Sequence, residues 1–421
     1  MSVSLTHRTI EAIWRIESPK LIAKLTKLVR DVSLAEDLAQ DALVIALEKW
    51  EQVGIPENPG AWLMTTAKRR AIDLLRRMNV QDQKYKEIAS HSDLFTVRDM
   101  NDVLDEEIDD DLLRLIFMTC HPVLSQDARV ALTLRLICGL TTEEIAHSFL
   151  VTESTIAQRI VRAKRTLNEK SVPFEVPVGE ELMKRLSTVL EVIYLMFNEG
   201  YSATSGDQCI RPFLCQEALR LGRVLAEMAP TEPEVHGLVS LMEIQFSRFK
   251  TRVNSKGEPI LLKNQKRAQW DQLLIRRGIA ALERSKKLGK SLGPYSLQAS
   301  ISACHALAPS EEETNWPRIA ALYEALSRVM PSPIVELNRA VAISMAFGPD
   351  FGIQIVDKLY SNPSLKSYHL LPSIRGDLLV KLGRYDEARS EFERAASLTK
   401  NEHERTLLRN RAMNCRNGSS T

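Results

Sequence analysis

Apolar residues recur at spacings of three and four along almost the whole chain, the period of an amphipathic α-helix. Alternating β-branched runs bounded by turns, which indicate half-buried strands, are nearly absent. The best candidate for a hairpin is RVNSKGEPILL, with Lys256 and Gly257 at its turn. The pattern therefore predicts an all-α protein.

Two breaks in the helical pattern divide the chain. The first is the acidic run RDMNDVLDEEIDDD, from Arg98 to Asp111, whose scarcity of apolar residues is typical of a solvated linker. The second is SVPFEVPVGEE, where Pro173 and Pro177 end the preceding helix and favour extended backbone. We expect four segments: a first unit over 1–96, a linker over 97–110, a compact unit over 111–172 and a helical part over 173–421.

The middle unit contains two short helices after a longer amphipathic one. DARVALTLRLICGL predicts a helix that ends at Gly139, a residue suited to a helix C-terminus. Thr141, with Glu144 three residues on, forms a capping box that begins the next helix, and Thr152 caps the last. A bracing helix followed by a helix with a polar face is the helix-turn-helix pattern, whose second helix enters the major groove.

The last of these helices has a polar and basic outer face. We expect an inner face made by Ile145, Ala146 and Phe149 on the bracing helix, by Leu150 and Val151 at the corner, and by Ile156, Ile160 and Val161 on the last helix. The outward residues are candidates for contacts with base edges and phosphates: Glu153, Ser154, Thr155, Gln158, Arg159, Arg162 and Arg165. A solvated face with a surplus of arginine is the alternative.

The first unit carries a second basic helix, NPGAWLMTTAKRRAIDLLRR, expected to follow a turn at Pro59 and Gly60. Its cations are offset only by Asp73, and they are Lys68, Arg69, Arg70, Arg76 and Arg77. Small hydroxyls at Thr65 and Thr66 and the ring of Trp62 complete a mixture suited to single-stranded DNA. A core position for Trp62 is the alternative, because Leu63, Ala67 and Ile72 lie nearby at helical spacing.

The helix SLAEDLAQDALVIALEKW precedes that segment, and we expect Ser33 to cap it with Glu36 as capping-box partner. An inner stripe is expected at Leu34, Leu38, Ala42 and Ile45. The outer face then consists of Glu36, Asp37, Gln40 and Asp41. Such an acidic face suits a protein partner with basic helices, although a merely solvated face is the alternative.

Composition adds limits to this picture. The 421 residues carry a formal net charge of +2, with 44% hydrophobic and 26% charged residues, as expected of an ordinary globular protein of two to four domains. A net charge near zero argues against a protein that coats nucleic acid along its whole surface. It does not exclude local basic patches that bind nucleic acid. The chain has no run of about 18 apolar residues and no signal-peptide pattern at its start, so we expect a cytoplasmic protein without a membrane partner.

The sequence offers few motifs typical of catalytic, metal-binding or cofactor-binding sites. The six cysteines are scattered, so we expect free thiols, no metal site and no cofactor. A Gly-rich phosphate loop, a metal-ligand cluster and a GxSxG motif are all missing from the sequence, which argues against an enzyme. Tyr201, next to Asn198 and Glu199, forms either a ligand pocket or a structural network with residues further along, namely Arg248, Arg252, Trp270 and Asp271.

Three of these segments resemble one family. AEDLAQDALVIALEKW, NPGAWLMTTAKRRAIDLLRR and GLTTEEIAHSFLVTESTIAQRIVRAKRTL resemble regions 2.2, 2.3 to 2.4 and 4.2 of extracytoplasmic-function (ECF) sigma factors of the sigma-70 superfamily, in that order. VIYLMFNEGYSATSGD, GPYSLQASISACHALA and PSPIVELNRAVAI resemble the subgroup with a long helical C-terminal extension. Tetratricopeptide-like repeats are clearest near 315–400, where one repeat matches at Gly376, Gly383, Tyr385, Ala388, Phe392 and Ala395; a generic helical bundle is the alternative.

The resemblance implies a transcription initiation factor that binds core RNA polymerase and directs it to promoter DNA. It implies polymerase contacts at Glu36, Asp37, Gln40 and Asp41. Contacts with the melted −10 strand are implied at Trp62, Thr65, Thr66, Lys68, Arg69, Asp73, Arg76 and Arg77. Contacts with the −35 duplex are implied at Glu153, Ser154, Thr155, Gln158, Arg159, Arg162 and Arg165. No catalytic residue is implied.

The C-terminal extension is expected to regulate activity or to contact polymerase, with a protein or small molecule as its own partner. Two other functions stay open. A helix-turn-helix regulator with a helical sensor domain would bind DNA as a dimer without polymerase. An adaptor that has lost its DNA function would bind polymerase or another protein and direct no transcription.

Overall fold

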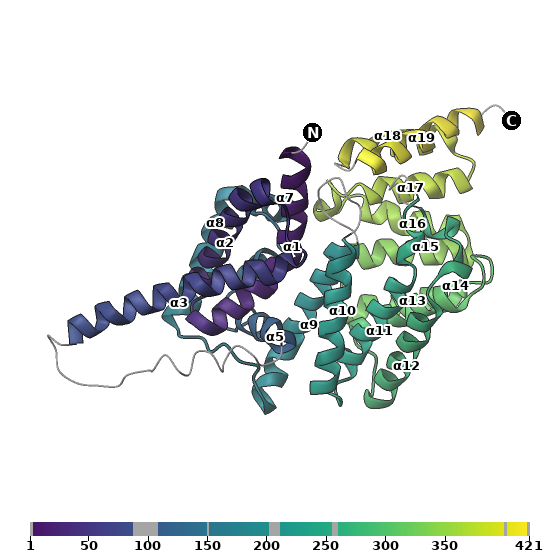
Figure 1. The fold of residues 1–421 in the computed structure, drawn as a ribbon. Helices are drawn as coiled ribbons and strands as arrows, with labels where there is room; N and C mark the ends of the chain where they lie inside the picture. Colours follow the sequence, from purple (N-terminus) through teal and green to yellow (C-terminus); the bar gives the residue numbers. More distant parts are fainter. Residues whose placement is uncertain are drawn as a thin grey trace. The chain divides into compact units, whose positions relative to one another are not determined.

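The computed structural model describes residues 3–86, 108–149, 151–201, 211–254, 260–399 and 402–418. Within these ranges the regular structure is helical, which confirms the all-α prediction (Figure 1). The hairpin turn expected at Lys256 and Gly257 lies outside the described residues, as do most of the expected acidic linker and Leu150. On either side of that segment, the Ile260 amide donates to the Arg252 carbonyl at 2.7 Å.

The chain forms two compact units, Met1–Glu199 and Gly200–Thr421. The first contains α1 (Val3–Val29), α2 (Val32–Val53), α3 (Pro59–Lys86), α5 (Ile108–Thr119), α6 (Gln126–Leu136), α7 (Thr142–Phe149), α8 (Glu153–Glu169) and most of α9 (Gly179–Tyr201). Helix α1 packs against α2, α3 and α5, while α8 packs against α6, α7 and α2. Among the described residues, no helix combines the length and the apolar character needed to cross a bilayer.

The helix-turn-helix begins as the sequence predicts. Gly139 takes a φ of +65°, and the Leu140 amide donates to the Leu134 carbonyl at 3.1 Å, so the end of α6 is closed by a left-handed residue. The capping box at α7 is present, because the Thr141 amide donates to Glu144 at 2.8 Å and the Glu144 amide donates to the Thr141 hydroxyl at 3.1 Å. Thr152 caps α8 by accepting from the Thr155 amide at 3.3 Å.

Two predicted helix starts are wrong. Asp31, not Ser33, caps α2, since its carboxylate accepts from the Ser33 amide at 2.7 Å and the Leu34 amide at 3.1 Å. Helix α3 already includes Pro59 and Gly60, because proline at the first helical position needs no hydrogen-bond partner for its nitrogen. The side chain of Asn58 accepts from the Ala61 amide at 3.0 Å and closes this start.

The inner face of α8 also differs from the prediction at one residue. Ile156, Ile160, Ala163 and Leu167 are buried. Val161, expected inside, is 63% exposed because it follows Ile160 by one residue and is rotated about 100° around the helix. Val151, expected to fill the corner, is 39% exposed.

Helix α5 begins at Ile108, within the segment expected to be a linker. Asp111 is only 1% exposed; it accepts from Arg114 at 2.9 Å and lies 3.7 Å from the Lys27 ammonium. At the other boundary, α8 ends at Glu169, before Pro173, and α9 begins at Gly179.

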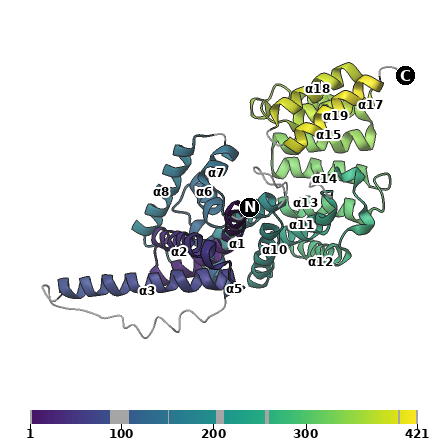
Figure 2. The ribbon, with the colours of Figure 1, turned by 45° about the horizontal axis from the view of Figure 1, so that its top comes forward.

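The second unit is a succession of helices: α10 (Pro212–Met228), α11 (Pro233–Ser247), α12 (Gln272–Leu288), α13 (Pro294–Leu307), α14 (Trp316–Val329), α15 (Pro333–Phe347), α16 (Pro349–Leu359), α17 (Leu370–Lys381), α18 (Tyr385–Leu398) and α19 (Glu402–Gly418). Short 3-10 turns lie at Phe249–Thr251, Leu262–Asn264, Arg267–Gln269 and Pro363–Leu365. Successive helices pack on one another, and Figure 2 shows α17, α18 and α19 together with α15 at one end of this unit.

The predicted tetratricopeptide-like pair corresponds to α17 and α18. Gly376 lies where the helices meet, since a Cβ there would be 2.8 Å from the ring of Phe392. Ala388, Phe392 and Ala395 are each at most 1% exposed. Gly383, with a φ of +74°, forms the turn between the two helices, so the repeat pattern correctly located the pair.

Candidate nucleic-acid interface

The outer face of α8 is polar and open to solvent. Glu153, Ser154, Thr155, Gln158, Arg162 and Arg165 are all exposed, and Arg159 is half-buried. At the start of the helix, the Thr152 hydroxyl lies 3.0 Å from the Ser154 hydroxyl and 2.8 Å from the Thr155 hydroxyl. A helix N-terminus with clustered hydroxyls offers donors to phosphate and to base edges.

Two cations of this face have partners within the protein. Arg159 lies 3.2 Å from Asp127 of α6, and Arg165 donates to Glu169 at 2.6 Å. The hydrogen bond with Glu169 raises the pKa of Arg165. The two carboxylates therefore compete for these guanidiniums with any other anion.

The basic face of α3 is exposed at Thr65, Arg69, Asp73, Arg76 and Arg77, while Trp62, Thr66 and Lys68 are half-buried. The Trp62 ring meets the buried ring of Trp50 edge to face, with centroids 5.3 Å apart. Trp62 therefore both packs on the core and keeps part of its surface open.

A groove of about 390 Å³ between α1 and α3 extends this basic face. Thr65, Lys68 and Arg69 line it from α3, and Lys24 faces them from α1. Its apolar floor consists of Leu25, Leu28, Met64 and Ile72. Lys24 was not among the predicted site residues, because it lies on α1 and not on the basic helix itself. The signal for it in the sequence is the row Lys20, Lys24 and Lys27 at helical spacing on α1.

On α2, Asp37, Gln40 and Asp41 are exposed as expected, and Asp41 accepts from Arg70 at 2.5 Å. The expected exposure of Glu36 is wrong, since this residue is 5% exposed. Its carboxylate accepts from Arg135 of α6 at 3.1 Å and also pairs with Lys164 of α8. These partners explain why Glu36 points inward and does not close a capping box.

Glu36 and its cationic partners form part of a wider contact, which we call the α2–α8 clasp: Asp31, Glu36, Arg135, Lys164 and Asn168. Asn168, near the end of α8, donates to Asp31 at 2.8 Å. A second link joins Arg15 of α1 to Glu144 of α7 at 3.5 Å. The helix-turn-helix is thus held against α1 and α2 by polar contacts in addition to packing.

In the second unit, the polar residues singled out from the sequence have mainly structural partners. Arg248 donates to the Tyr201 hydroxyl at 2.5 Å, and the Arg252 guanidinium lies 3.6 Å from the centre of the Tyr201 ring. Asp271 caps α12 by accepting from the Leu273 and Leu274 amides. Trp270 lines a cavity. In the described ranges, no three His, Cys, Asp or Glu side chains gather as metal ligands would.

Comparison with protein families gives three matches along the chain. Residues 13–79 match sigma-70 region 2, and residues 114–167 match sigma-70 region 4. Residues 185–286 match a family described as of unknown function, DUF6596. The first match covers most of α1, all of α2 and most of α3, and the second covers the helix-turn-helix.

Two relatives span different parts of the chain. An uncharacterized protein of Rhizobium meliloti (strain 1021) is 38% identical over 397 residues, which is 93% of this chain and 92% of that protein. The "Probable ECF RNA polymerase sigma factor SigI" of Mycobacterium tuberculosis (strain CDC 1551 / Oshkosh) is 27% identical over 198 residues, which is 44% of this chain and 68% of that protein. The first relative therefore shares the C-terminal half as well.

Proposed function

We propose that this chain directs core RNA polymerase to promoters by reading a −35 element as duplex and a −10 element as a melted strand. The chain belongs to the extracytoplasmic-function sigma factors of the sigma-70 superfamily and carries a helical C-terminal extension. Sigma factors act in transcription initiation and are not enzymes, so the chemistry of RNA synthesis belongs to polymerase.

The observation that carries the −35 assignment is the division of α8 into two faces. Ile156, Ile160, Ala163 and Leu167 are buried, and the polar residues from Glu153 to Arg165 turn outward. Gln158 and the hydroxyls near the helix start suit base edges, and Arg162 and Arg165 suit phosphates. Each good bidentate base contact would contribute about 1 to 3 kcal/mol of discrimination.

The basic face of α3 and the groove beside it support the −10 assignment. Lys24, Lys68 and Arg69 surround an apolar floor, and none of the described residues that line this groove carries a carboxylate. Cations around an apolar surface suit a single strand, because its phosphates and its unstacked bases can both be bound. Arg76 and Arg77 extend the positive charge along α3.

We assign the polymerase contact to the exposed residues of α2, namely Asp37, Gln40 and Asp41. Glu36 does not belong to this exposed set in the closed arrangement. An acidic helix face favours a partner with basic helices and speeds association through electrostatic attraction.

Promoter binding requires the α2–α8 clasp to open. Elements named −35 and −10 lie about 25 base pairs apart, which is about 85 Å at about 3.4 Å per pair. Lys164 of α8 pairs directly with Glu36 of α2, and the 17 residues of α8 span only about 26 Å. While this contact persists, α3 and α8 cannot reach the −10 and the −35 element at the same time. The free chain is thus a closed form that polymerase opens.

We assign residues 1–96 to region 2, 111–172 to region 4 and 173–421 to a regulatory extension that contacts polymerase or favours the closed form. Helix α9 contacts α6 through Arg129 and Thr188 at 3.3 Å, so a truncation that tests the extension should follow Glu199. Unchanged transcription together with unchanged stability of the truncated chain would contradict a regulatory role.

Footprinting with and without core polymerase tests the proposal. We expect protection of two DNA elements about 25 base pairs apart, only when polymerase is present, and loss of the upstream protection in Arg162→Ala. Lys170→Ala, which removes an exposed cation at the end of the same helix, is the matched control and should leave the footprint intact. Protection by the chain without polymerase would instead indicate a helix-turn-helix regulator.

A further inference from the structure

The second unit contains a small polar cavity of about 200 Å³ next to α11, α13 and α14, which we call the extension cavity. Its lining residues with polar groups are Gln245, Arg248, Trp270, Ser302, His305 and Tyr323. Among the described residues that line it there is no Asp or Glu, and the guanidinium of Arg248 is the formal charge in this set.

Two nitrogens in this lining have no hydrogen-bond partner within the described protein: Nε1 of Trp270 and Nδ1 of His305. Trp270 is 3% exposed. A buried N–H without a partner costs about 1 to 3 kcal/mol, so a molecule in the cavity that accepts from it is favoured. Burial and the guanidiniums of Arg248 and Arg267 lower the pKa of His305 to about 4, so its ring is neutral at pH 7 and can donate from Nδ1 in one tautomer.

The lining is held in place by contacts outside the cavity. The Nε of Arg248 donates to the Tyr201 hydroxyl at 2.5 Å, and the guanidinium lies 5.7 Å from the centre of the Tyr201 ring. The His305 ring meets the Trp316 ring edge to face at 5.2 Å. Arg267 donates to the His305 carbonyl at 3.0 Å and to the Ala308 carbonyl at 2.9 Å, and thereby fixes the end of α13. The donors are therefore preorganised, which lowers the entropy lost on binding.

Three aliphatic residues complete the lining of the cavity. They are Ile244, Leu262 and Ile301. One cation, two buried ring nitrogens and an apolar wall match a single negative charge attached to a short alkyl group. A doubly charged phosphate would leave one charge uncompensated beside the apolar wall, at a large desolvation cost. Guanidinium also binds the two oxygens of a carboxylate in a fork geometry.

We propose that the extension cavity binds a small organic monocarboxylate, with its oxygens held by Arg248, Trp270 and His305 and its alkyl group against Ile244 and Ile301. This binding site goes beyond the role in transcription initiation. It is tested by binding alone, so its failure would leave that role untouched.

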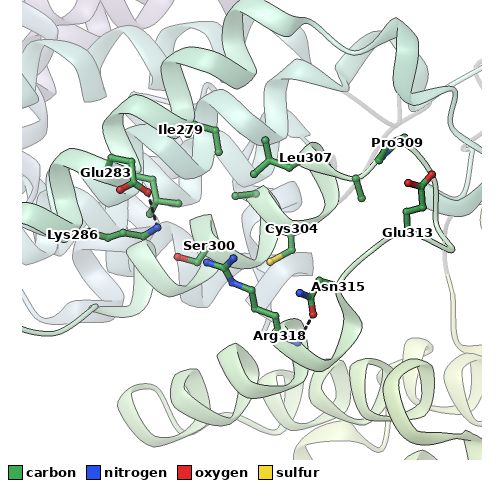
Figure 3. A pocket seen from close by; sticks show the side chains of 13 residues that line it. Ile279, Glu283, Lys286, Ser300, Cys304, Leu307, Pro309, Glu313, Asn315 and Arg318 are labelled. Atoms are coloured by element: carbon green, nitrogen blue, oxygen red, sulfur yellow. Dashed lines mark hydrogen bonds and ion pairs between the residues drawn. The ribbon is translucent and has the colours of Figure 1, made fainter.

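A larger cavity of about 350 Å³ in the same unit lacks such buried groups without a partner among the described residues (Figure 3). Glu283 and Lys286 pair with each other at 2.8 Å, and the Asn315 side chain accepts from the Arg318 amide at 3.0 Å. None of its lining residues carries a buried side-chain nitrogen or oxygen without a partner among the described residues. The described polar groups of this cavity therefore give no reason to propose a ligand there.

Indole N–H signals provide the test. The chain has 5 tryptophans. Their signals are recorded by NMR on the full-length protein labelled with ¹⁵N at tryptophan, and Trp270→Phe identifies the signal of Trp270. Sodium butyrate, its neutral isostere butyramide and inorganic phosphate are titrated separately. We expect butyrate alone to shift the Trp270 signal with half-saturation at about 1 mM or below, a reasonable affinity for so small a ligand.

Variants separate the site from a general effect of salt. Arg248→Gln should weaken butyrate binding at least about tenfold, as expected when a charged partner is lost. Arg248→Lys, which keeps the charge and guards against misfolding, should bind with intermediate affinity. Arg276→Gln removes an exposed arginine of α12 and should bind as the wild type does. Equal shifts with butyramide, a response to phosphate but not butyrate, or no response at all would each overturn the proposal.

Discussion

Replacing Lys164 with methionine should open the α2–α8 clasp. The side chains of Lys164 and Glu36 are 14% and 6% exposed, so their ion pair is largely shielded from water. Removing one partner of a buried pair costs about 3 to 5 kcal/mol when the other charge is left uncompensated. Here Arg135 stays 3.1 Å from Glu36 with a side chain 29% exposed, so we expect a smaller cost, about 2 kcal/mol.

A change of about 2 kcal/mol alters the ratio of closed to open chains by about 30-fold. Energy transfer between dyes at the exposed positions Glu48 of α2 and Glu143 of α7 reports this opening. We expect the Lys164→Met chain to open at a core polymerase concentration up to about 30-fold lower than the wild type requires.

Lys170→Met is the control, since it removes a cation from the C-terminal end of α8 where the side chain is exposed. It should open at the wild-type polymerase concentration. Thermal unfolding of both variants checks that the helices stay folded. If Lys164→Met and Lys170→Met open alike, the ion pair does not control the closed form and the reasoning is refuted.

Three further outcomes are expected. Asp127→Asn should free Arg159 and raise the DNA affinity of the polymerase complex about threefold, measured by anisotropy at several salt concentrations; an unchanged or lower affinity would contradict this. Because the pKa of His305 is lowered to about 4, the folded chain binds fewer protons than the unfolded one below about pH 6.5. Its stability in urea should thus fall by about 2 kcal/mol from pH 7 to pH 5, and His305→Asn should remove this loss. Gly376→Ala would place a Cβ 2.8 Å from the Phe392 ring and should cost about 1 to 3 kcal/mol in thermal unfolding, with partial recovery on adding Phe392→Leu; no cost would refute the close approach.

Local signals in the sequence predicted what neighbouring residues determine. The capping box of Thr141 and Glu144 and the left-handed Gly139 form as expected, because their partners lie within a few residues. The repeat motif located Gly376 against Phe392 for a similar reason, since both belong to one pair of adjacent helices.

Residues whose partners lie far away in the sequence were predicted wrongly. Glu36 was expected outside, yet its partners Arg135 and Lys164 are 99 and 128 residues away. Helical periodicity assigns a residue to a face but does not say which helix covers that face. Lys24 was missed because the groove needs both α1 and α3, and Asp111 is buried because α1 supplies Lys27.

Run-off transcription with purified core RNA polymerase on fragmented genomic DNA of the source organism is the measurement that tests the role in promoter recognition. We expect new discrete transcripts that require this chain, share two upstream elements about 25 base pairs apart and disappear with Arg162→Ala. Lys170→Ala should leave them in place. If the chain binds polymerase and its Lys164→Met form is open, yet the transcripts are the same with and without the chain, then it does not direct polymerase to promoters.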